Sequence, residues 1–204
     1  GFIFSINRDL FKHQNNLKKL NIFKQTTANE ISSKKIGIIG FGSIGKDLAK
    51  LLSPLKCKIF YNDIRKITPN NSLHKQKSLN FILSNSDIIT IHTPLTKKTK
   101  NLINMTNINL CKNKSIIINC ARGGIINENA LYNFLKKNKS ASAAFDVFQN
   151  EPPKNNKLLK LKNFYCSAHI GGSTSESIKT MGLSAINGLD KFVDIRNLKK
   201  FGYI

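Results

Sequence analysis

Apolar residues gather in six short runs between residues 35 and 168, at 35–40, 57–62, 87–92, 115–119, 142–148 and 163–168. Each run is continuous rather than alternating, which is typical of strands that are covered on both faces of a sheet. Stretches with apolar residues at helical spacing lie between most of the runs, at 46–55, 77–85 and 127–137. This alternation predicts an α/β fold with a doubly wound parallel sheet, which binds ligands at the carboxyl ends of its strands.

Two further helices are predicted outside this alternating region. Residues 2–20 and 175–195 both carry apolar side chains near helical spacing. We therefore predict an N-terminal helix and linker at residues 1–30, a nucleotide-binding domain at 31–172, and a C-terminal helix and tail at 173–204. A chain of 204 residues is long enough to bury a core and suits one large domain with appendages.

The charged residues do not form a pattern typical of nucleic-acid binding. A formal net charge of +22 at pH 7 would by itself favour an anionic partner such as nucleic acid or a membrane surface. The lysines, however, are scattered among asparagines, in stretches such as NNLKK and PKNNK, with few aromatic residues to stack on bases. We predict no nucleic-acid partner and attribute the charge to biased composition; a basic domain that binds RNA or DNA is the alternative.

The sequence pattern favours a cytoplasmic protein without a membrane partner. No apolar stretch approaches the ~18 residues of a membrane span, and the N-terminus lacks the pattern of a secretion signal. Cys57, Cys111, Cys120 and Cys166 form no C-x-x-C pair, and three of them lie in or beside apolar runs. Such cysteines are typical of reduced thiols that pack as small hydrophobes. We predict no metal site; an organelle, reached with a transit peptide since removed, is the alternative location.

The stretch GFGSIGKDLAKLL places Gly40, Gly42 and Gly45 in G-x-G-x-x-G spacing. It directly follows an expected strand and precedes an expected helix, which is the context of a dinucleotide-binding turn. The free N–H groups at the start of that helix favour phosphate binding, and the amides of Ser43 and Ile44 are best placed for it. Glycines at an ordinary tight turn are the alternative interpretation.

An acidic residue follows the glycines at the distance that this interpretation requires. Asp63 lies 18 positions after Gly45, at the end of the next expected strand. A carboxylate at this point accepts hydrogen bonds from the adenosine ribose hydroxyls and repels a 2′-phosphate, so the sequence favours NAD over NADP. Arg65 and Lys66 are nearby cations that weaken this preference.

Three ionisable residues follow the ends of the last three expected strands: Arg122, Glu151 and His169. An arginine can hold a substrate carboxylate and polarise the adjacent carbonyl, and a histidine can move the proton of a hydroxyl group. A glutamate beside the histidine stabilises the imidazolium and fixes the ring. Gly171 and Gly172 would keep the backbone narrow beside a nicotinamide. Taken singly, these residues are also compatible with a surface charge, a loop residue and a strand-end cap.

These motifs, in this order, resemble the D-isomer-specific 2-hydroxyacid dehydrogenases. The resemblance runs through GIIGFGSIGK, HTPLT, INCARGGIIN, AAFDVFQNEPP and AHIGGSTSES, and members that act on 3-phosphoglycerate are the most similar. It implies that Arg122, Glu151 and His169 are catalytic. It further implies that Asp146 binds the nicotinamide carboxamide. The remaining implied contacts are Thr93 and Pro94 beside the adenosine, and Cys120 and Ala121 along the cofactor groove.

The resemblance implies oxidation of 3-phosphoglycerate to 3-phosphohydroxypyruvate with NAD, the entry step of serine synthesis, by a homodimer or higher oligomer. Alternatives are a glyoxylate or hydroxypyruvate reductase, or an NAD-sensing interaction protein without catalysis. The chain departs from the family at Ser167–Ala168, where members usually carry Thr-Pro before the histidine. A substrate domain that normally precedes the first helix is not found in the sequence, so we expect the nucleotide-binding half of such an enzyme.

Overall fold

A computed structural model describes residues 1–25, 27–67 and 74–188 of the chain. The chain divides after Ala168 into two compact units. The first unit, Gly1–Ala168, contains the whole sheet, and the second begins at His169 and contains helix α6 (Ser175–Gly188). The part of the predicted C-terminal helix beyond residue 188 lies outside the described residues.

The first unit is built on a parallel sheet in the order β3-β2-β1-β4-β5-β6-β7. This order confirms the predicted doubly wound fold, because the chain starts in the middle of the sheet and winds outward in both directions. All six predicted strands form, and the short edge strand β3 was not predicted. The strands are β1 (Lys35–Ile39), β2 (Lys58–Asn62), β3 (Lys75–Gln76), β4 (Ile88–Ile91), β5 (Ile116–Asn119), β6 (Ser142–Phe145) and β7 (Phe164–Cys166).

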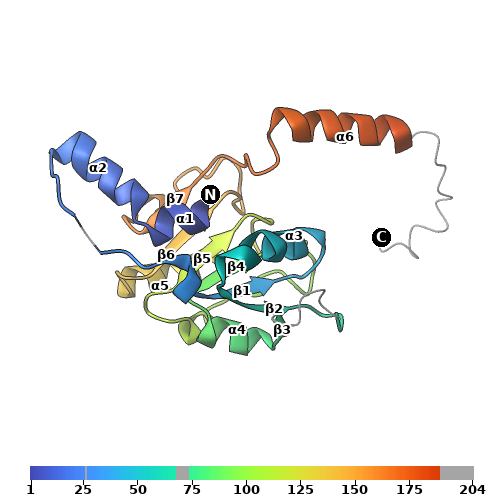
Figure 1. The fold of residues 1–204 in the computed structure, drawn as a ribbon, viewed down its shortest axis with the longest axis horizontal. Coiled ribbons are helices and arrows are strands. Elements are labelled where there is room, and N and C mark those ends of the chain that lie inside the picture. Colours follow the sequence, from blue (N-terminus) through green and yellow to red (C-terminus); the bar gives the residue numbers. More distant parts are fainter. Residues whose placement is uncertain (26, 68–73, 189–204) are drawn as a thin grey trace. The chain divides into compact units, whose positions relative to one another are not determined.

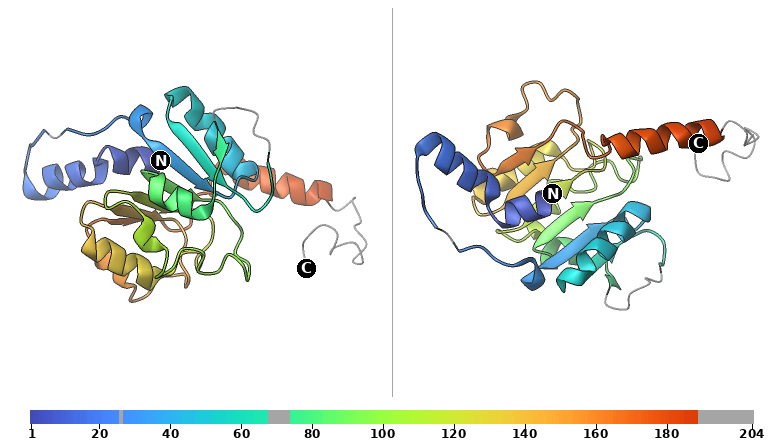
Figure 2. Two further views of the ribbon diagram at one scale, coloured as in Figure 1. Left: turned by 90° about the horizontal axis from the view of Figure 1, so that it is seen from below. Right: turned by 45° about the horizontal axis from the view of Figure 1, so that its top comes forward.

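Helices cover both faces of this sheet. Figure 1 shows α1 (Phe2–Asn7) and α3 (Ser43–Leu52) above it, and α4 (Leu79–Asn85) and α5 (Glu128–Lys137) below it. The view from below in Figure 2 has α4, in green, and α5, in gold, in front of the strands. Shorter 3-10 helices lie in the connections: η1 (Ile31–Ser33), η2 (Ser53–Leu55), η3 (Ile108–Leu110) and η4 (Lys157–Lys160).

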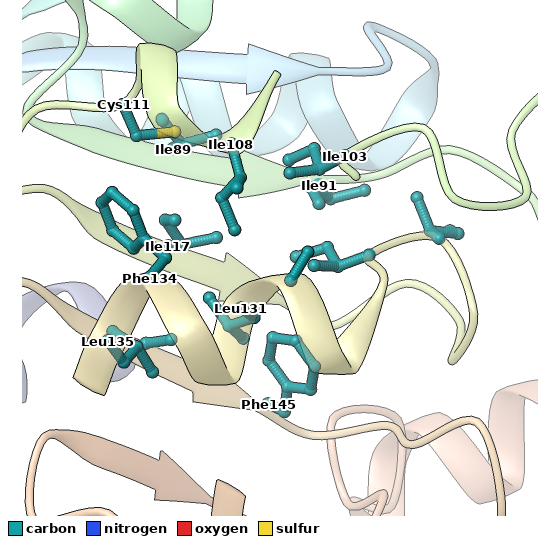
Figure 3. Packing of buried hydrophobic residues seen from close by; sticks show 14 of the residues in the cluster. Ile89, Ile91, Ile103, Ile108, Cys111, Ile117, Leu131, Phe134, Leu135 and Phe145 are labelled. Atoms are coloured by element: carbon teal, nitrogen blue, oxygen red, sulfur yellow. The ribbon is translucent and has the colours of Figure 1, made fainter. Parts of the chain in front are cut away.

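The apolar strand runs are continuous because successive side chains enter two different cores. Ile117 packs in the cluster on the α4 and α5 side, whereas Ile118 packs in the cluster on the α1 and α3 side. Figure 3 shows side chains of β4 and β5 directed toward the apolar face of α5, where Leu131, Phe134 and Leu135 lie. Burial on both faces fixes the position of each strand, and therefore the position of the residue that follows it.

The N-terminal segment forms two helices where one was expected. Helix α1 ends at Asn7, and α2 (Leu10–Leu20) begins after Asp9, whose φ of 52° breaks the helical path. Ile3 and Ile6 hold α1 in the core, but α2 has no buried residue, because polar residues occupy most of it. The ring of Phe11 nevertheless stacks on Tyr165 of β7, with 4.9 Å between ring centroids.

Helix α6 exposes its apolar side chains within its own unit. No residue of α6 is buried, and Ile178, Met181, Leu183 and Ile186 are each more than half exposed. No helix in the described part of the chain has the length and hydrophobicity that crossing a bilayer requires.

Candidate functional site

Because the strands are parallel and in register, the residues that directly follow β1, β2, β4, β5, β6 and β7 lie in a common row at the carboxyl edge of the sheet. Ile39 pairs with both Asn62 and Ile91, and the same level continues across the sheet through Asn119, Phe145 and Cys166. The residues one position further on form what we call the edge row: Asp63, Gly40, His92, Cys120, Asp146 and Ser167.

Backbone hydrogen bonds extend the ladder into the edge row. Gly40 N–H donates to Asn62 O at 2.8 Å, and His92 N–H donates to Ile39 O at 2.7 Å. The N–H groups of Asp146 and Ser167 make the equivalent bonds to the strand beside each, at 3.0 Å. Four residues of the row are therefore tied to the sheet by backbone hydrogen bonds. His92 and Ser167 were not predicted as site residues.

The three glycines of the turn after β1 have three different structural roles. Gly40 has a φ of 90°, and a Cβ there would lie 2.5 Å from His92 O. A Cβ on Gly45 would lie 2.2 Å from Gly40 O, so α3 packs against the turn only because this position lacks a side chain. A Cβ on Gly42 would meet nothing within 4 Å, which leaves the backbone open to a ligand. This division of roles is what a diphosphate-binding turn requires.

Helix α3 presents an uncapped N-terminus beside this turn. Gly42 is its N-cap, no side chain makes a capping hydrogen bond, and no acidic residue lies in the first turn. Ser43 and Ile44, the first residues of the helix, are exposed. The N–H groups and the positive end of the helix dipole are therefore available to an anion.

Asp63 is held in a fixed orientation beside Gly40. Its Oδ2 accepts the Phe41 N–H at 2.9 Å, and its Oδ1 accepts the Arg65 N–H at 2.9 Å and Arg65 Nε at 3.4 Å. Burial alone would raise the pKa of Asp63, but these N–H donors and the Arg65 guanidinium hold it below its usual value. The carboxylate is therefore ionised and pre-oriented at the end of β2, where an adenosine ribose would be recognised.

The loops that carry Arg122 and Glu151 are in direct contact. A Cβ on Gly123 would lie 1.9 Å from Phe148 O, so the two backbones approach each other as closely as a glycine allows. Phe148 N–H in turn donates to Glu151 Oε1 at 2.9 Å. The side chains of Arg122 and Glu151 are both exposed. The first unit thus brings the guanidinium-bearing and carboxylate-bearing loops together at the carboxyl edge.

Two polar side chains that the sequence reasoning missed hold these loops. Asn119 is fully buried at the end of β5, where its Oδ1 accepts Ala121 N–H at 3.1 Å and its Nδ2 donates to Arg122 O at 2.9 Å. Glu128, in the first turn of α5, accepts Gln149 N–H at 2.9 Å and Asn156 Nδ2 at 2.7 Å. Two sequence features could have identified them: Asn119 is an amide at the end of an apolar strand, and Glu128 is an acid at the start of a helix.

The connection after β4 lies against the Arg122 loop. A Cβ on Gly124, whose φ is 78°, would lie 3.8 Å from a Leu95 methyl carbon. Thr99 Oγ1 donates to Pro94 O at 2.6 Å, which closes this connection into a tight turn. The Thr93 hydroxyl is buried and has no hydrogen-bond partner among the described residues. The predicted adenosine-flanking residues Thr93 and Pro94 thus lie on an ordered segment.

Cys120 is an unreactive thiol in the edge row. Partial desolvation and the nearby Asp146 carboxylate raise its pKa to about 11, although the side chain is exposed. The thiol therefore stays protonated at neutral pH, whereas a nucleophilic cysteine needs a lowered pKa. Its role, like that of Ala121, would be to line a groove.

The remaining predicted residues belong to the second unit. His169, Gly171 and Gly172 are exposed within it, and His169 has a left-handed backbone with a φ of 56°. A Cβ on Gly172 would meet nothing within 4 Å. The catalytic assignment of His169, and the placing of both glycines beside a nicotinamide, stay predictions.

Comparison with known proteins assigns the chain to a family. A family model described as D-isomer specific 2-hydroxyacid dehydrogenase, NAD binding domain, matches residues 1–171. This chain belongs to that family. The 204 residues contain its NAD-binding domain, and NAD is the cofactor.

Relatives of this chain are named for different substrates. A D-3-phosphoglycerate dehydrogenase of Methanocaldococcus jannaschii is 40% identical over 156 residues, which are 75% of this chain and 30% of that protein. A hydroxypyruvate reductase of Thermotoga maritima is 37% identical over 176 residues, 84% of this chain and 57% of that protein. A crystal structure of an Aquifex aeolicus D-lactate dehydrogenase complexed with NAD and lactic acid is 27% identical, with a TM-score of 0.83.

The chain covers only part of these dehydrogenases. The match to the Aquifex structure spans 93% of this chain and 63% of that one, and the shares of the two other relatives are smaller still. The residues present fit NAD: an open backbone at Gly42, a free helix N-terminus and an oriented Asp63 carboxylate. The described part of the chain contains no group of three or more potential metal ligands.

The different roles of Gly42 and Gly45 are separable by alanine substitution. Gly42→Ala should leave the free energy of unfolding within about 1 kcal/mol of wild type, because φ is −74° and the space is open. It should weaken NAD binding at least about tenfold, because the methyl group would project toward the diphosphate. Gly45→Ala should cost about 1–3 kcal/mol of stability through overpacking. Urea denaturation and calorimetric NAD titration measure both; undiminished NAD binding by Gly42→Ala would contradict this site.

His92 should make the stability of the fold pH-dependent. Burial lowers its pKa from 6.5 to about 4, and Thr90 Oγ1 lies 2.9 Å from its Nε2. The unfolded chain therefore binds a proton at a higher pH than the folded chain, so stability is lost as pH falls from 6.5 toward 4. We expect His92→Gln to remove roughly 1–2 kcal/mol of the stability difference between about pH 7.5 and about pH 5. Urea denaturation at both pH values tests this; an unchanged difference would show that His92 is not held neutral.

Proposed function

We propose that this chain supplies the cofactor site and the catalytic residues of an NAD-dependent dehydrogenase that oxidises the CH–OH group of a D-2-hydroxy acid. The proposal rests on one observation: the predicted cofactor-binding residues and the loops of Arg122 and Glu151 lie at the same carboxyl edge of the sheet. The glycine turn and Asp63 lie toward one end of the edge row, and the contacting loops of Arg122 and Glu151 follow β5 and β6. Family membership of residues 1–171 supports it independently.

The proposed division of labour follows from the chemistry of each group. Arg122 binds the substrate carboxylate through its planar guanidinium and polarises the adjacent carbon–oxygen bond. His169 accepts the hydroxyl proton during oxidation and returns it during reduction, and Glu151 stabilises the resulting imidazolium. Bound NAD supplies the acceptor for the hydride that leaves the substrate carbon. Asp146 binds the carboxamide of the nicotinamide and so orients the ring.

We propose 3-phosphoglycerate as the substrate, which would place the enzyme at the first step of L-serine biosynthesis. The M. jannaschii relative that bears this activity in its name supports the choice. Hydroxypyruvate and glyoxylate are the competing substrates, since the T. maritima relative is a hydroxypyruvate reductase of similar identity. A phosphorylated substrate, rather than an unmodified 2-hydroxy acid, is therefore the part of the proposal that a substrate panel tests first.

We also propose that the protein acts as a homodimer or higher oligomer in the cytoplasm. The exposed apolar side chains of α6 support self-association, because a helix with this many exposed apolar groups is costly in water. Sedimentation of the purified protein would establish the oligomeric state.

His169 should be required for turnover but not for cofactor binding. We expect His169→Asn to abolish oxidation of 3-phosphoglycerate while leaving the NAD affinity within about twofold of wild type, because a proton carrier contributes mainly to the chemical step. Turnover is measured as NADH absorbance with the protein expressed together with any adjoining coding sequence, and binding is measured on the 204 residues.

Two outcomes would count against the assignment. Full turnover in His169→Asn would remove His169 from the mechanism. NAD binding without turnover of 3-phosphoglycerate, hydroxypyruvate or glyoxylate by the wild-type protein would favour an NAD-sensing interaction protein over an enzyme. His13→Asn is the matched control, since His13 lies in the N-terminal helices and has no proposed part in the reaction.

A further inference from the structure

The ends of β6 and β7 bring a serine and a buried carboxylate into contact. Phe145 pairs with Cys166 in the parallel ladder, so the next residues, Asp146 and Ser167, lie side by side in the edge row. Ser167 Oγ donates a hydrogen bond to Asp146 Oδ1 at 2.5 Å. Ser167 N–H also donates to Phe145 O at 3.0 Å, which fixes the serine backbone. The contact is therefore a product of the register of two strands.

The Asp146 side chain needs such a donor because it is buried. Only 3% of Asp146 is exposed, and ionised carboxylates at that depth are retained when hydrogen bonds compensate for lost solvation. A bond from a serine on the neighbouring strand also restricts rotation of the carboxylate about its Cβ–Cγ bond. Ser167 thus compensates for part of the lost solvation of Asp146 and fixes its orientation.

Asp146 also lies beside Cys120 in the edge row. Desolvation raises the pKa of the Cys120 thiol, and the nearby Asp146 carboxylate raises it further. Asp146 is therefore flanked by Cys120, which follows β5, and by Ser167, which follows β7. Under the proposed function, this is the part of the edge where a nicotinamide carboxamide is bound.

We propose that Ser167 is a positioning residue for the nicotinamide end of the cofactor, and that it acts through Asp146. Its hydroxyl holds Oδ1 so that the carboxylate keeps one orientation for accepting the carboxamide N–H. This inference rests on the proposed function, because it assumes that NAD occupies the edge row. A threonine at this position would keep the hydroxyl that makes this bond.

Comparison of NAD with ADP-ribose isolates this role. ADP-ribose carries the adenosine, diphosphate and second ribose but no nicotinamide, so Ser167 should affect only NAD. We expect Ser167→Ala to weaken NAD binding roughly three- to tenfold, the usual range for one lost hydrogen bond, and to leave ADP-ribose binding unchanged. Ser167→Thr should restore NAD binding. Calorimetric titration of the 204-residue chain gives the affinity of wild type and of each variant for both ligands.

Ser53→Ala is the matched control for loss of a half-buried serine hydroxyl. Ser53 Oγ bonds Ala49 O at 2.7 Å and His74 Nε2 at 2.9 Å, beyond the C-terminus of α3. The ratio of NAD affinity to ADP-ribose affinity in Ser53→Ala should equal the ratio in wild type. Thermal melting of each variant separates loss of the fold from loss of the ligand, because an unfolded variant loses both ligands.

A double-mutant cycle with Asp146→Asn decides whether Ser167 acts through the carboxylate. Asp146→Asn should lower the same affinity ratio, and adding Ser167→Ala should lower it no further. Additive effects, or equal losses for both ligands, would overturn the positioning role while leaving the NAD site in place. A wild-type chain that binds neither ligand would overturn the proposed function itself, and the inference with it.

Discussion

The parallel register of the sheet is the constraint on which the site depends. All strands run in the same direction, so every strand end lies at one edge, and the pairing of Ile39 with its neighbours sets a common level there. Burial of successive strand residues in two separate cores prevents any strand from sliding by one position, since a slip would expose a whole apolar face. The packing of isoleucines thereby determines where Asp63 and Asp146 stand.

Beyond the strands, the site is shaped by close backbone approach rather than by large side chains. The lack of a side chain at Gly45 lets helix α3 pack against the Gly40 carbonyl, and the lack of one at Gly123 lets the Phe148 carbonyl approach closely. Short polar side chains then hold the loops: Asn119 fixes the Arg122 loop, and Glu128 fixes the loop that leads to Glu151. The side chains of Arg122 and Glu151 can remain exposed, because these hydrogen bonds hold the loops that carry them.

Local patterns were sufficient to predict most of the helices and strands and the tight glycine turn after β1. Continuous apolar runs identified the six long strands, and the glycine spacing after the first of them identified the turn, because both depend on neighbours in sequence. The two-residue strand β3 and the helix break at Asp9 left no comparable pattern. Ser167 and Glu128 were missed because their partners, Asp146 and Gln149, lie 21 residues away in each case. Asp146 itself was identified only through the family resemblance, since nothing in its local sequence distinguishes a buried acceptor from a turn residue.

The central claim is that NAD lies along the carboxyl edge of the sheet, and amide mapping by NMR tests it most directly. Addition of NAD to the isotope-labelled chain should shift the amide signals of Gly42, Ser43, Asp63, Cys120 and Asp146. The amides of Lys35 and Lys58, which begin β1 and β2 at the opposite edge, should stay unchanged. Shifts confined to that opposite edge, or no shifts at saturating NAD, would contradict the account.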